Sequence, residues 1–189
     1  MAGLVGSEMC IRDRHNIPND FPAEVLSEAQ KSWSLTLEGR EDLRSIPLIT
    51  IDPPDARDHD DACYARPDDD PENRGGYIIW VAIADIAYYV RSETLLDKEA
   101  LKRGNSTYFP DRVSPMLPEN LSADLCSLHE GVDRYCIAVQ IKINADGEKL
   151  SHSFHRGLMR SAASLSYEQV QRAYDEKPHD VPEDIVQNI

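Results

Sequence analysis

An acidic run, DPPDARDHDD at residues 52–61, constrains the folding of this 189-residue sequence more than any other feature. Five of its ten residues are aspartate, and it directly follows the apolar, β-branched residues 46–51. Two carboxylates held about 4 Å apart near a protein surface repel each other by roughly 4 kcal/mol. A fold that places this run beside a core strand must therefore spread the charges into solvent or compensate them with a cation.

Strand periodicity limits which of these carboxylates can converge. In an extended chain, Asp58 and Asp60 share one face while Asp61 points to the other, so one regular strand cannot unite them. The two prolines after Asp52 force a turn instead. We therefore expect Asp52, at the end of one strand, to meet the three later aspartates at the start of the next.

Such a corner is suited to a hard divalent cation. Mg²⁺ prefers oxygen ligands in octahedral geometry, and proteins usually hold it with one or two carboxylates together with substrate phosphate oxygens. The predicted corner could form one or two metal sites, at which a phosphodiester bridges the ions and a bound water is activated. The spacing is therefore compatible with magnesium-assisted phosphodiester chemistry.

Two other interpretations of the acidic run stay open. An Asp-rich loop is as often a solvated turn as it is a metal site. A calcium-binding structural loop is weaker, because the segment lacks the glycine and the final glutamate of an EF-hand and has prolines at its early positions.

The overall charge excludes nonspecific attraction to nucleic acid by the whole chain. Asp and Glu number 34 against 20 Lys and Arg, which gives a formal net charge of -14. Because polyanions are bound by concentrated positive charge, an RNA partner would require metal ions, a local basic groove or a neighbouring domain.

The composition predicts a cytoplasmic protein. The longest apolar stretch, residues 77–84, is far shorter than the roughly 18–20 residues of a membrane span. The cysteines, Cys10, Cys63, Cys126 and Cys136, are widely spaced without a CxxC motif, which argues against a zinc ribbon or a disulfide scaffold. We expect the last three to be small buried hydrophobic residues with reduced thiols.

Hydrophobic patterning predicts an α+β fold, with a mixed, mainly antiparallel sheet and a few packed helices. Strands are expected at residues 46–51, 62–65, 77–90, 134–144 and 148–157, with the last two joined as a hairpin through Asp146-Gly147. Helices are expected at residues 23–33, at residues 92–104 with Ser92 as the cap, and at residues 167–174.

Three segments carry a family resemblance: IDPPDARDHDDACY, YIIWVAIADIAYYV and RGNSTYFPDRVSPMLPENLSADLCSL. In order and spacing they resemble the catalytic RNB module of the ribonuclease II and ribonuclease R family, with the ribonuclease R branch nearer. The resemblance implies that residues 15–40 are a linker with a short helix. Residues 41–189 would be the N-terminal part of a truncated RNB domain, and residues 1–14 a non-native or disordered segment.

The resemblance implies hydrolytic, processive degradation of single-stranded RNA from its 3′ end to nucleoside 5′-monophosphates. Magnesium, as one or two ions, is the implied cofactor; neither DNA nor a membrane is expected as a partner, and a monomer is expected. The family's catalytic module continues beyond this length and supplies further groups, so we expect the fragment to be weak or inactive by itself. The alternative is a catalytically degenerate RNB-like module that binds RNA or a protein.

By position, the resemblance assigns the catalytic aspartates of the family to Asp52, Asp58, Asp60 and Asp61. Asp52 and Asp61 are the implied direct metal ligands, and Asp58 completes the metal sites. Asp60 belongs to the same set and is the implied residue on which hydrolysis depends most.

The resemblance also implies an RNA-binding role for Tyr108, which matches the tyrosine that stacks on the terminal nucleotide. Stacking on a base is worth about 1–3 kcal/mol and is independent of sequence, although Tyr108 by itself would more often be a partly buried core residue. Arg57, Arg103 and Arg112 are further candidates for contacts with the RNA backbone. A surface ion pair accounts for Arg57 equally well.

The histidines are weaker candidates. His152 and His155 lie at odd spacing in a predicted strand, so they should be on opposite faces and not share a metal. The side chain of His59 should diverge from those of its acidic neighbours, and we expect a structural role for it.

Overall fold

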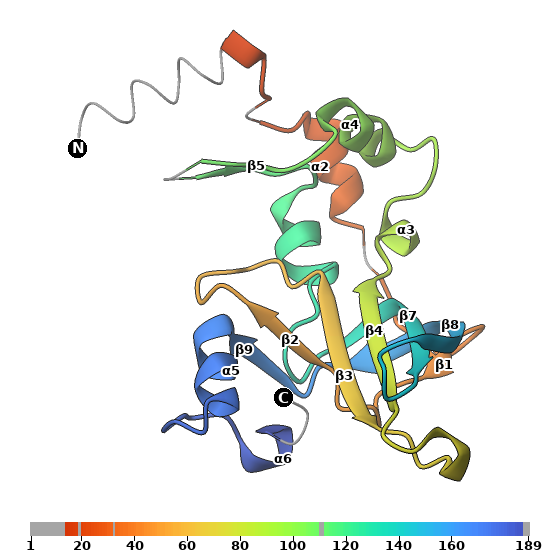
Figure 1. Cartoon of the computed structure of the whole chain (residues 1–189). Coiled ribbons are helices and arrows are strands. Elements are labelled where there is room, and N and C mark those ends of the chain that lie inside the picture. The colour runs from red at the N-terminus through yellow and green to blue at the C-terminus, as the bar shows by residue number, and fades with distance from the viewer. Residues whose placement is uncertain (1–13, 19, 32, 110–111, 187–189) are drawn as a thin grey trace. The chain divides into compact units, whose positions relative to one another are not determined.

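The computed structural model describes residues 14–18, 20–31, 33–109 and 112–186 (Figure 1). It divides into two compact units. Unit 1 comprises Met1–Trp33 and Ala87–Ser122, and unit 2 comprises Ser34–Ile86 and Ala123–Ile189. The predicted non-native or disordered segment lies outside the described residues except for Arg14. None of the helices in the described ranges has the length and apolar character needed to cross a membrane.

Unit 2 is built on a seven-stranded sheet in the order β1-β8-β7-β4-β3-β2-β9 (Figure 1). The strands are β1 (Glu41–Asp42), β2 (Ile49–Asp52), β3 (Asp61–Pro67), β4 (Tyr77–Ala84), β7 (Asp133–Ile143), β8 (Lys149–Arg160) and β9 (Ala163–Ser166). Only the edge pairs β1–β8 and β2–β9 are parallel. The central pairings are antiparallel. This arrangement confirms the predicted α+β class with a mixed, mainly antiparallel sheet.

The two faces of the sheet pack against different partners. On one face, alternate residues of β4 join Leu48, Leu128 and Met159 in the larger core cluster. On the other face, Ile49 and Leu165 pack with residues of α5 (Tyr167–Tyr174) and α6 (Glu183–Val186). The period-two alternation of β4 therefore places successive side chains in two separate environments.

Local sequence signals account for the hairpin and for α5. Gly147 adopts a φ of 81°, and its N–H bonds the carbonyl of Asn144 at 3.0 Å, which closes the β7–β8 turn predicted at Asp146-Gly147. The helix α5 begins where a reciprocal capping box forms between Ser166 and Gln169. Both predictions are confirmed.

The expected strand over residues 77–90 is too long. The strand β4 ends at Ala84, and the helical turn α3 (Ile86–Tyr89) follows. Between them, the buried Asp85 pairs with Arg40 through its carboxylate and donates its backbone N–H to the carbonyl of Tyr135 at 2.9 Å. These tertiary partners turn the chain within a sequence whose apolar pattern would otherwise continue the strand.

Unit 1 contains α2 (Ala23–Ala29), α4 (Leu95–Arg103) and a two-stranded ribbon of β5 (Thr107–Tyr108) and β6 (Val113–Ser114). Two single turns of other helix types complete the elements: η1 (Pro71–Asn73) belongs to unit 2, and η2 (Leu121–Leu125) spans the boundary at Ser122. The predicted cap of α4 was wrong: Thr94, not Ser92, accepts a hydrogen bond from the backbone N–H of Asp97. A φ of 68° at Glu93 turns the chain just before this cap.

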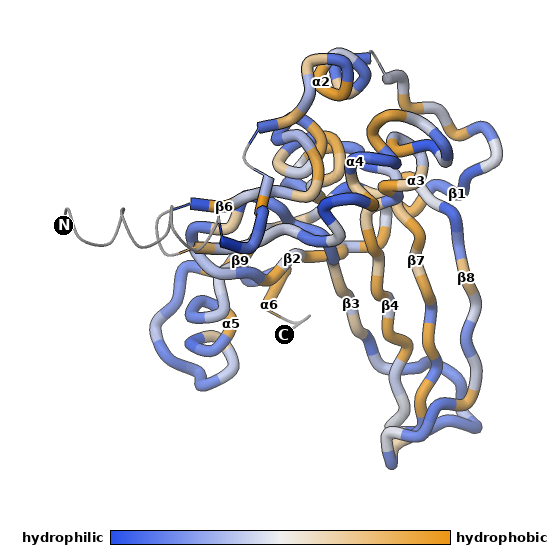
Figure 2. The backbone as a smooth tube through the Cα atoms, turned by 90° about the horizontal axis from the view of Figure 1, so that it is seen from above, coloured by the Kyte–Doolittle hydropathy of each residue, from blue (hydrophilic) through white to orange (hydrophobic). Residues whose placement is uncertain are grey.

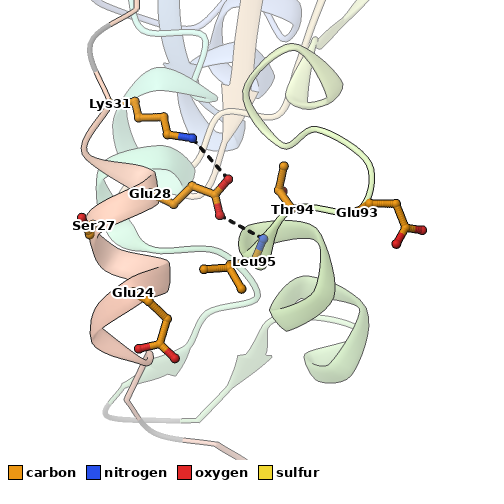
Figure 3. A pocket seen from close by; sticks show the side chains of 7 residues that line it. All are labelled: Glu24, Ser27, Glu28, Lys31, Glu93, Thr94 and Leu95. Carbon is orange, nitrogen blue, oxygen red and sulfur yellow. Dashed lines mark hydrogen bonds and ion pairs between the residues drawn. The ribbon is translucent and has the colours of Figure 1, made fainter.

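A second side chain caps α4 from outside the helix. Glu28 of α2 accepts hydrogen bonds from the backbone N–H groups of Leu95 and Leu96 at 2.9 and 3.2 Å. It also pairs with Lys31 at 3.4 Å, as Figure 3 shows. A carboxylate at a helix N-terminus satisfies unpaired donors and complements the helix dipole, so Glu28 links α2 to α4.

We predict that Glu28→Ala destabilises the protein by about 1–2 kcal/mol, because two backbone donors lose a charged acceptor. Chemical denaturation followed by circular dichroism measures this change. Glu24→Ala, in the first turn of the same helix, is the matched control and should cost only a few tenths of a kcal/mol. Equal effects of the two substitutions would contradict the capping role.

Candidate functional site

The acidic run forms the corner between two neighbouring strands of unit 2. Asp52 is the last residue of β2, and Asp61 is the first residue of β3. The strands pair in an antiparallel register through Ile49 and Cys63. The intervening loop turns at once, because the N–H of Ala56 bonds the carbonyl of Pro53 at 3.0 Å. The predicted strand-end positions of Asp52 and Asp61 are confirmed, whereas Asp58 and Asp60 lie in the loop before β3.

The electrostatics of the corner show that its carboxylates influence one another. The pKa of Asp60 is raised above its ordinary value, first by desolvation and then by the negative charges of Asp58, Asp61 and Asp52. A neighbouring negative charge disfavours ionisation of a carboxyl group. The pKa of Asp60 is therefore set by its desolvation together with the charges of the three other aspartates.

His59 does not diverge from the acidic cluster as predicted. Its Nδ1 lies 2.7 Å from Oδ2 of Asp52, and both side chains are mostly buried. The His59 ring also packs edge-on against that of His129, with centroids 5.6 Å apart. The prediction assumed an extended backbone, whereas the loop before β3 is irregular, and His59 contacts Asp52 across the turn.

A buried serine from the SADLCSL segment braces the acidic loop. The hydroxyl of Ser127 accepts the backbone N–H of His59 at 2.9 Å and donates to the carbonyl of Arg57 at 3.2 Å. The N–H of Leu128 bonds the carbonyl of His59, and the buried Arg134 of β7 donates to the carbonyl of Ser127. The segment belongs to one of the quoted family motifs, but sequence reasoning gave this serine no role.

The thiols near the site are structural. Burial raises the pKa of Cys126 to about 12, and the charge of Asp60 is the next cause of the rise. Burial likewise raises the pKa of Cys136 to about 12 and raises that of Cys63. Because the thiolate is the reactive form, these residues behave as the small hydrophobic groups that the sequence predicted.

The predicted RNA-binding residues are distributed over both units. Arg57 is an exposed residue of the acidic loop in unit 2. In unit 1, Tyr108 lies on β5 opposite Val113 and is 64% exposed, so it is not a core tyrosine. Arg112 is exposed, and its carbonyl accepts a hydrogen bond from the N–H of Phe109.

Arg103 has a different environment from the one expected of an RNA contact. Its side chain is only 2% exposed and pairs with Glu99 at 2.9 Å. It donates to the carbonyls of Asp20 and Pro115, and it lies over the ring of Phe21 at 3.5 Å. A guanidinium with these partners stabilises unit 1, and we therefore leave Arg103 out of the proposed RNA contacts.

The donor chemistry of the corner fits magnesium bound together with a substrate. Within the described ranges, no group of three or more His, Cys, Asp and Glu side chains is placed to hold an ion by itself. Mg²⁺ does not require such a group, because one or two carboxylates, waters and substrate phosphate oxygens complete its ligands. The carboxylates at the corner supply hard oxygen donors, and their mutual repulsion would be relieved by a cation.

Comparison with known proteins identifies the family. A model of the RNB domain matches residues 40–189. The chain belongs to the RNB family. It is 46% identical over 177 residues to Ribonuclease R of Vibrio cholerae, a match that covers 90% of this chain and 21% of that protein. It is 49% identical over 160 residues to Ribonuclease R of Escherichia coli, covering 82% of this chain and 19% of that protein.

A solved structure of this family shares the fold. RNase R of Mycoplasma genitalium, in complex with double-stranded RNA, matches with a TM-score of 0.86 and 29% identity, covering 94% of this chain and 32% of that chain. The chain thus spans about a fifth of the length of the two curated RNB relatives above and about a third of this structure. The acidic corner lies within the segment that the RNB model matches.

We predict that Asp60→Asn raises the melting temperature of the metal-free RNB chain at neutral pH. The pKa of Asp60 is raised in the folded state. At pH values between the unfolded and the folded pKa, the native protein holds a proton that the unfolded chain has released. The free energy of unfolding therefore falls as the pH rises through this range, and it stays lower at neutral pH. The neutral amide removes that loss.

Differential scanning calorimetry in buffer with a chelator measures the effect, with Asp55→Asn as the control for a general loss of charge. A lower melting temperature for Asp60→Asn than for Asp55→Asn would contradict the electrostatic account of the corner.

Proposed function

We propose that this chain carries part of the active site of a magnesium-dependent 3′ to 5′ exoribonuclease. The substrate is single-stranded RNA, which the complete enzyme degrades processively to nucleoside 5′-monophosphates. The observation that carries the proposal is the corner between β2 and β3 in a chain of the RNB family, where desolvation and the charges of Asp58, Asp61 and Asp52 raise the pKa of Asp60. The resemblance to Ribonuclease R of two bacteria supports the choice of RNA.

Asp52 and Asp61 are the proposed direct ligands of magnesium, and Asp58 completes the metal sites. Two features support this assignment. Asp52 and Asp61 stand at the ends of paired strands, which are rigid positions, and the Ser127 brace fixes the loop between them. When bound, magnesium supplies a Lewis acid for the scissile phosphate and a water of lowered pKa.

Asp60 is the proposed carboxylate on which hydrolysis depends most. Desolvation and then the charges of its three acidic partners oppose its ionisation. Its charge is therefore sensitive to a cation and a phosphate entering the corner, and groups with perturbed pKa values gather at functional sites. Its backbone is fixed, because its carbonyl accepts the N–H of Ala84 at 3.0 Å.

Tyr108 is the proposed stacking partner of an RNA base, with Arg57 and Arg112 as contacts for the backbone. The exposure of the Tyr108 ring supports this role, since a ring buried in a core could not stack on a nucleotide. Stacking on an aromatic ring accepts any base, which suits an enzyme that consumes RNA of every sequence.

The complete activity belongs to a longer protein in this proposal. The chain covers about a fifth of each curated relative described above, and an active site assembled from the remainder as well would leave this part weak or inactive by itself. The test therefore uses a chimera, in which this chain replaces the matching segment of Vibrio cholerae Ribonuclease R.

We predict that the chimera releases nucleoside 5′-monophosphates from a single-stranded RNA with a free 3′ end, and only when magnesium is present. Asp60→Asn should lower the rate by at least about 10²-fold, the scale typical of a lost electrostatic group in an active site. Filter binding should show that the variant still binds the RNA.

Asp55→Asn is the matched control, since it removes a charge from the same loop and should keep most of the activity. If the chimera and its Asp60→Asn variant are equally inactive while both bind RNA, the chain is instead a degenerate module that binds RNA without cutting it.

We predict that Tyr108→Ala raises the KM of the chimera for RNA, because about 1–3 kcal/mol of base stacking is lost. Tyr108→Phe keeps the ring and should retain most of the affinity. Steady-state kinetics on substrates that end in different bases provide the measurement. An equal loss in both variants would show that the hydroxyl group, and not stacking, is what Tyr108 contributes.

A further inference from the structure

A row of apolar side chains crosses the sheet of unit 2 on one face. Strand register places Ile49, Cys63, Val81, Val139 and Phe154 side by side on β2, β3, β4, β7 and β8. Directly paired residues in neighbouring strands point to the same side of a sheet. The exposed fractions of these five side chains therefore show how much of this face is covered from one edge of the sheet to the other.

The cover of this face ends partway across the sheet. Ile49 is 1% exposed beneath residues of α5 and α6, and Cys63 is the last member of the row that packs against that cluster. Phe154, at the other end, is 72% exposed. Figure 1 shows α5 and α6 beside β9 and β2, and Figure 2 shows β8 at the opposite edge from α5.

The uncovered part is broad and apolar. We define the open face as eight apolar residues that β4, β7 and β8 direct to this side: Tyr77, Ile79, Val81, Ile83, Ile137, Val139, Ile141 and Phe154. The register also places His152 and Arg156 of β8 on this side, on either side of Phe154. Each is exposed or only half-buried. Figure 2 shows the hydrophobic stretches along β4 and β7. The opposite face of the same strands already packs in the larger core, so the sheet is apolar on both sides.

An apolar face of this kind marks an interaction site. Soluble monomers rarely expose contiguous apolar patches of more than a few hundred Å². RNA is a poor occupant, because a polyanion is bound by concentrated positive charge. The register places one arginine on this side, Arg156 opposite Ile137, and it already pairs with the buried Asp85 at 3.4 Å. β-Branched residues on a sheet instead favour packing against another layer of protein.

Two observations select the occupant. The helices α5 and α6 already form the first part of a layer over this face, and the open face continues directly from the row that they cover. The segment matched here is about a fifth of each related RNB protein. The rest of such a polypeptide is therefore long enough to supply a further layer over this face. A second copy of this chain, docked on the open face, would be blocked on one side by α5 and α6.

We propose that the open face binds apolar side chains from the part of an RNB polypeptide that lies outside the segment matched here, extending the layer that α5 and α6 begin. The row next to the first contains Asp61, Ile83, Ile137 and Arg156. The covering layer therefore borders the acidic corner. The inference rests on packing and does not depend on hydrolysis.

The test is coexpression of this 189-residue chain with a tagged second chain, the remainder of Vibrio cholerae Ribonuclease R that follows its matching segment. The two chains should copurify. Phe154→Lys and Ile137→Lys, singly and together, should reduce the recovery of this chain at least tenfold in the double variant. Phe154 is so exposed that its substitution should leave the circular dichroism and melting temperature of the isolated chain unchanged.

Leu101→Lys is the control, since Leu101 is an equally apolar residue of α4 that is 81% exposed and lies off the open face. It should copurify normally, as should Asp60→Asn, which separates this test from the failure of the catalytic proposal. Failure of the native chain to copurify, or equal recovery of all variants, would overturn the inference. A dimer of the isolated chain that is seen by light scattering and is dissociated by Phe154→Lys would also overturn the inference. RNA binding by the isolated chain that Phe154→Lys abolishes would do the same.

Discussion

Electrostatic repulsion within the β2–β3 corner is the constraint on which the account of this chain depends. Four carboxylates would separate if the loop were free, but the loop is fixed at several points. The hydroxyl of the buried Ser127 bonds its backbone on both sides of Asp58, and Ala84 bonds the carbonyl of Asp60. Desolvation, and then the charges of the other three aspartates, raise the pKa of Asp60. In the proposed function, this fixed corner is where a bound cation would offset the repulsion.

The sheet explains why the corner can be maintained. The strands β2 and β3 lie between the larger core on one face and the α5–α6 cluster on the other, so Asp52 and Asp61 project from rigid strand ends. Farther along the same sheet, cover on the second face ends at Cys63. The acidic corner and the open face thus belong to one continuous surface, which links assembly of the protein to its site.

Structural features that depend on neighbouring residues could be predicted from the sequence, whereas features that depend on tertiary contacts could not. The turn at Gly147, the start of α5 at its capping box and the strand-end positions of Asp52 and Asp61 follow from residues near in sequence. The end of β4, by contrast, depends on the pairing of Asp85 with Arg40, 45 residues away.

The bond between His59 and Asp52 and the brace from Ser127 depend in the same way on an irregular loop that periodicity cannot describe.

The central claim, that the β2–β3 corner binds magnesium, is tested most directly by the melting temperature of the metal-free chain as magnesium is added. The measurement compares the native protein with the double variant Asp52→Asn/Asp61→Asn. A ligand that binds only the folded state stabilises it by RT ln(1 + [L]/Kd). The account predicts a magnesium-dependent rise for the native chain that is largely absent from the double variant. No rise, or the same rise in both proteins, would contradict it.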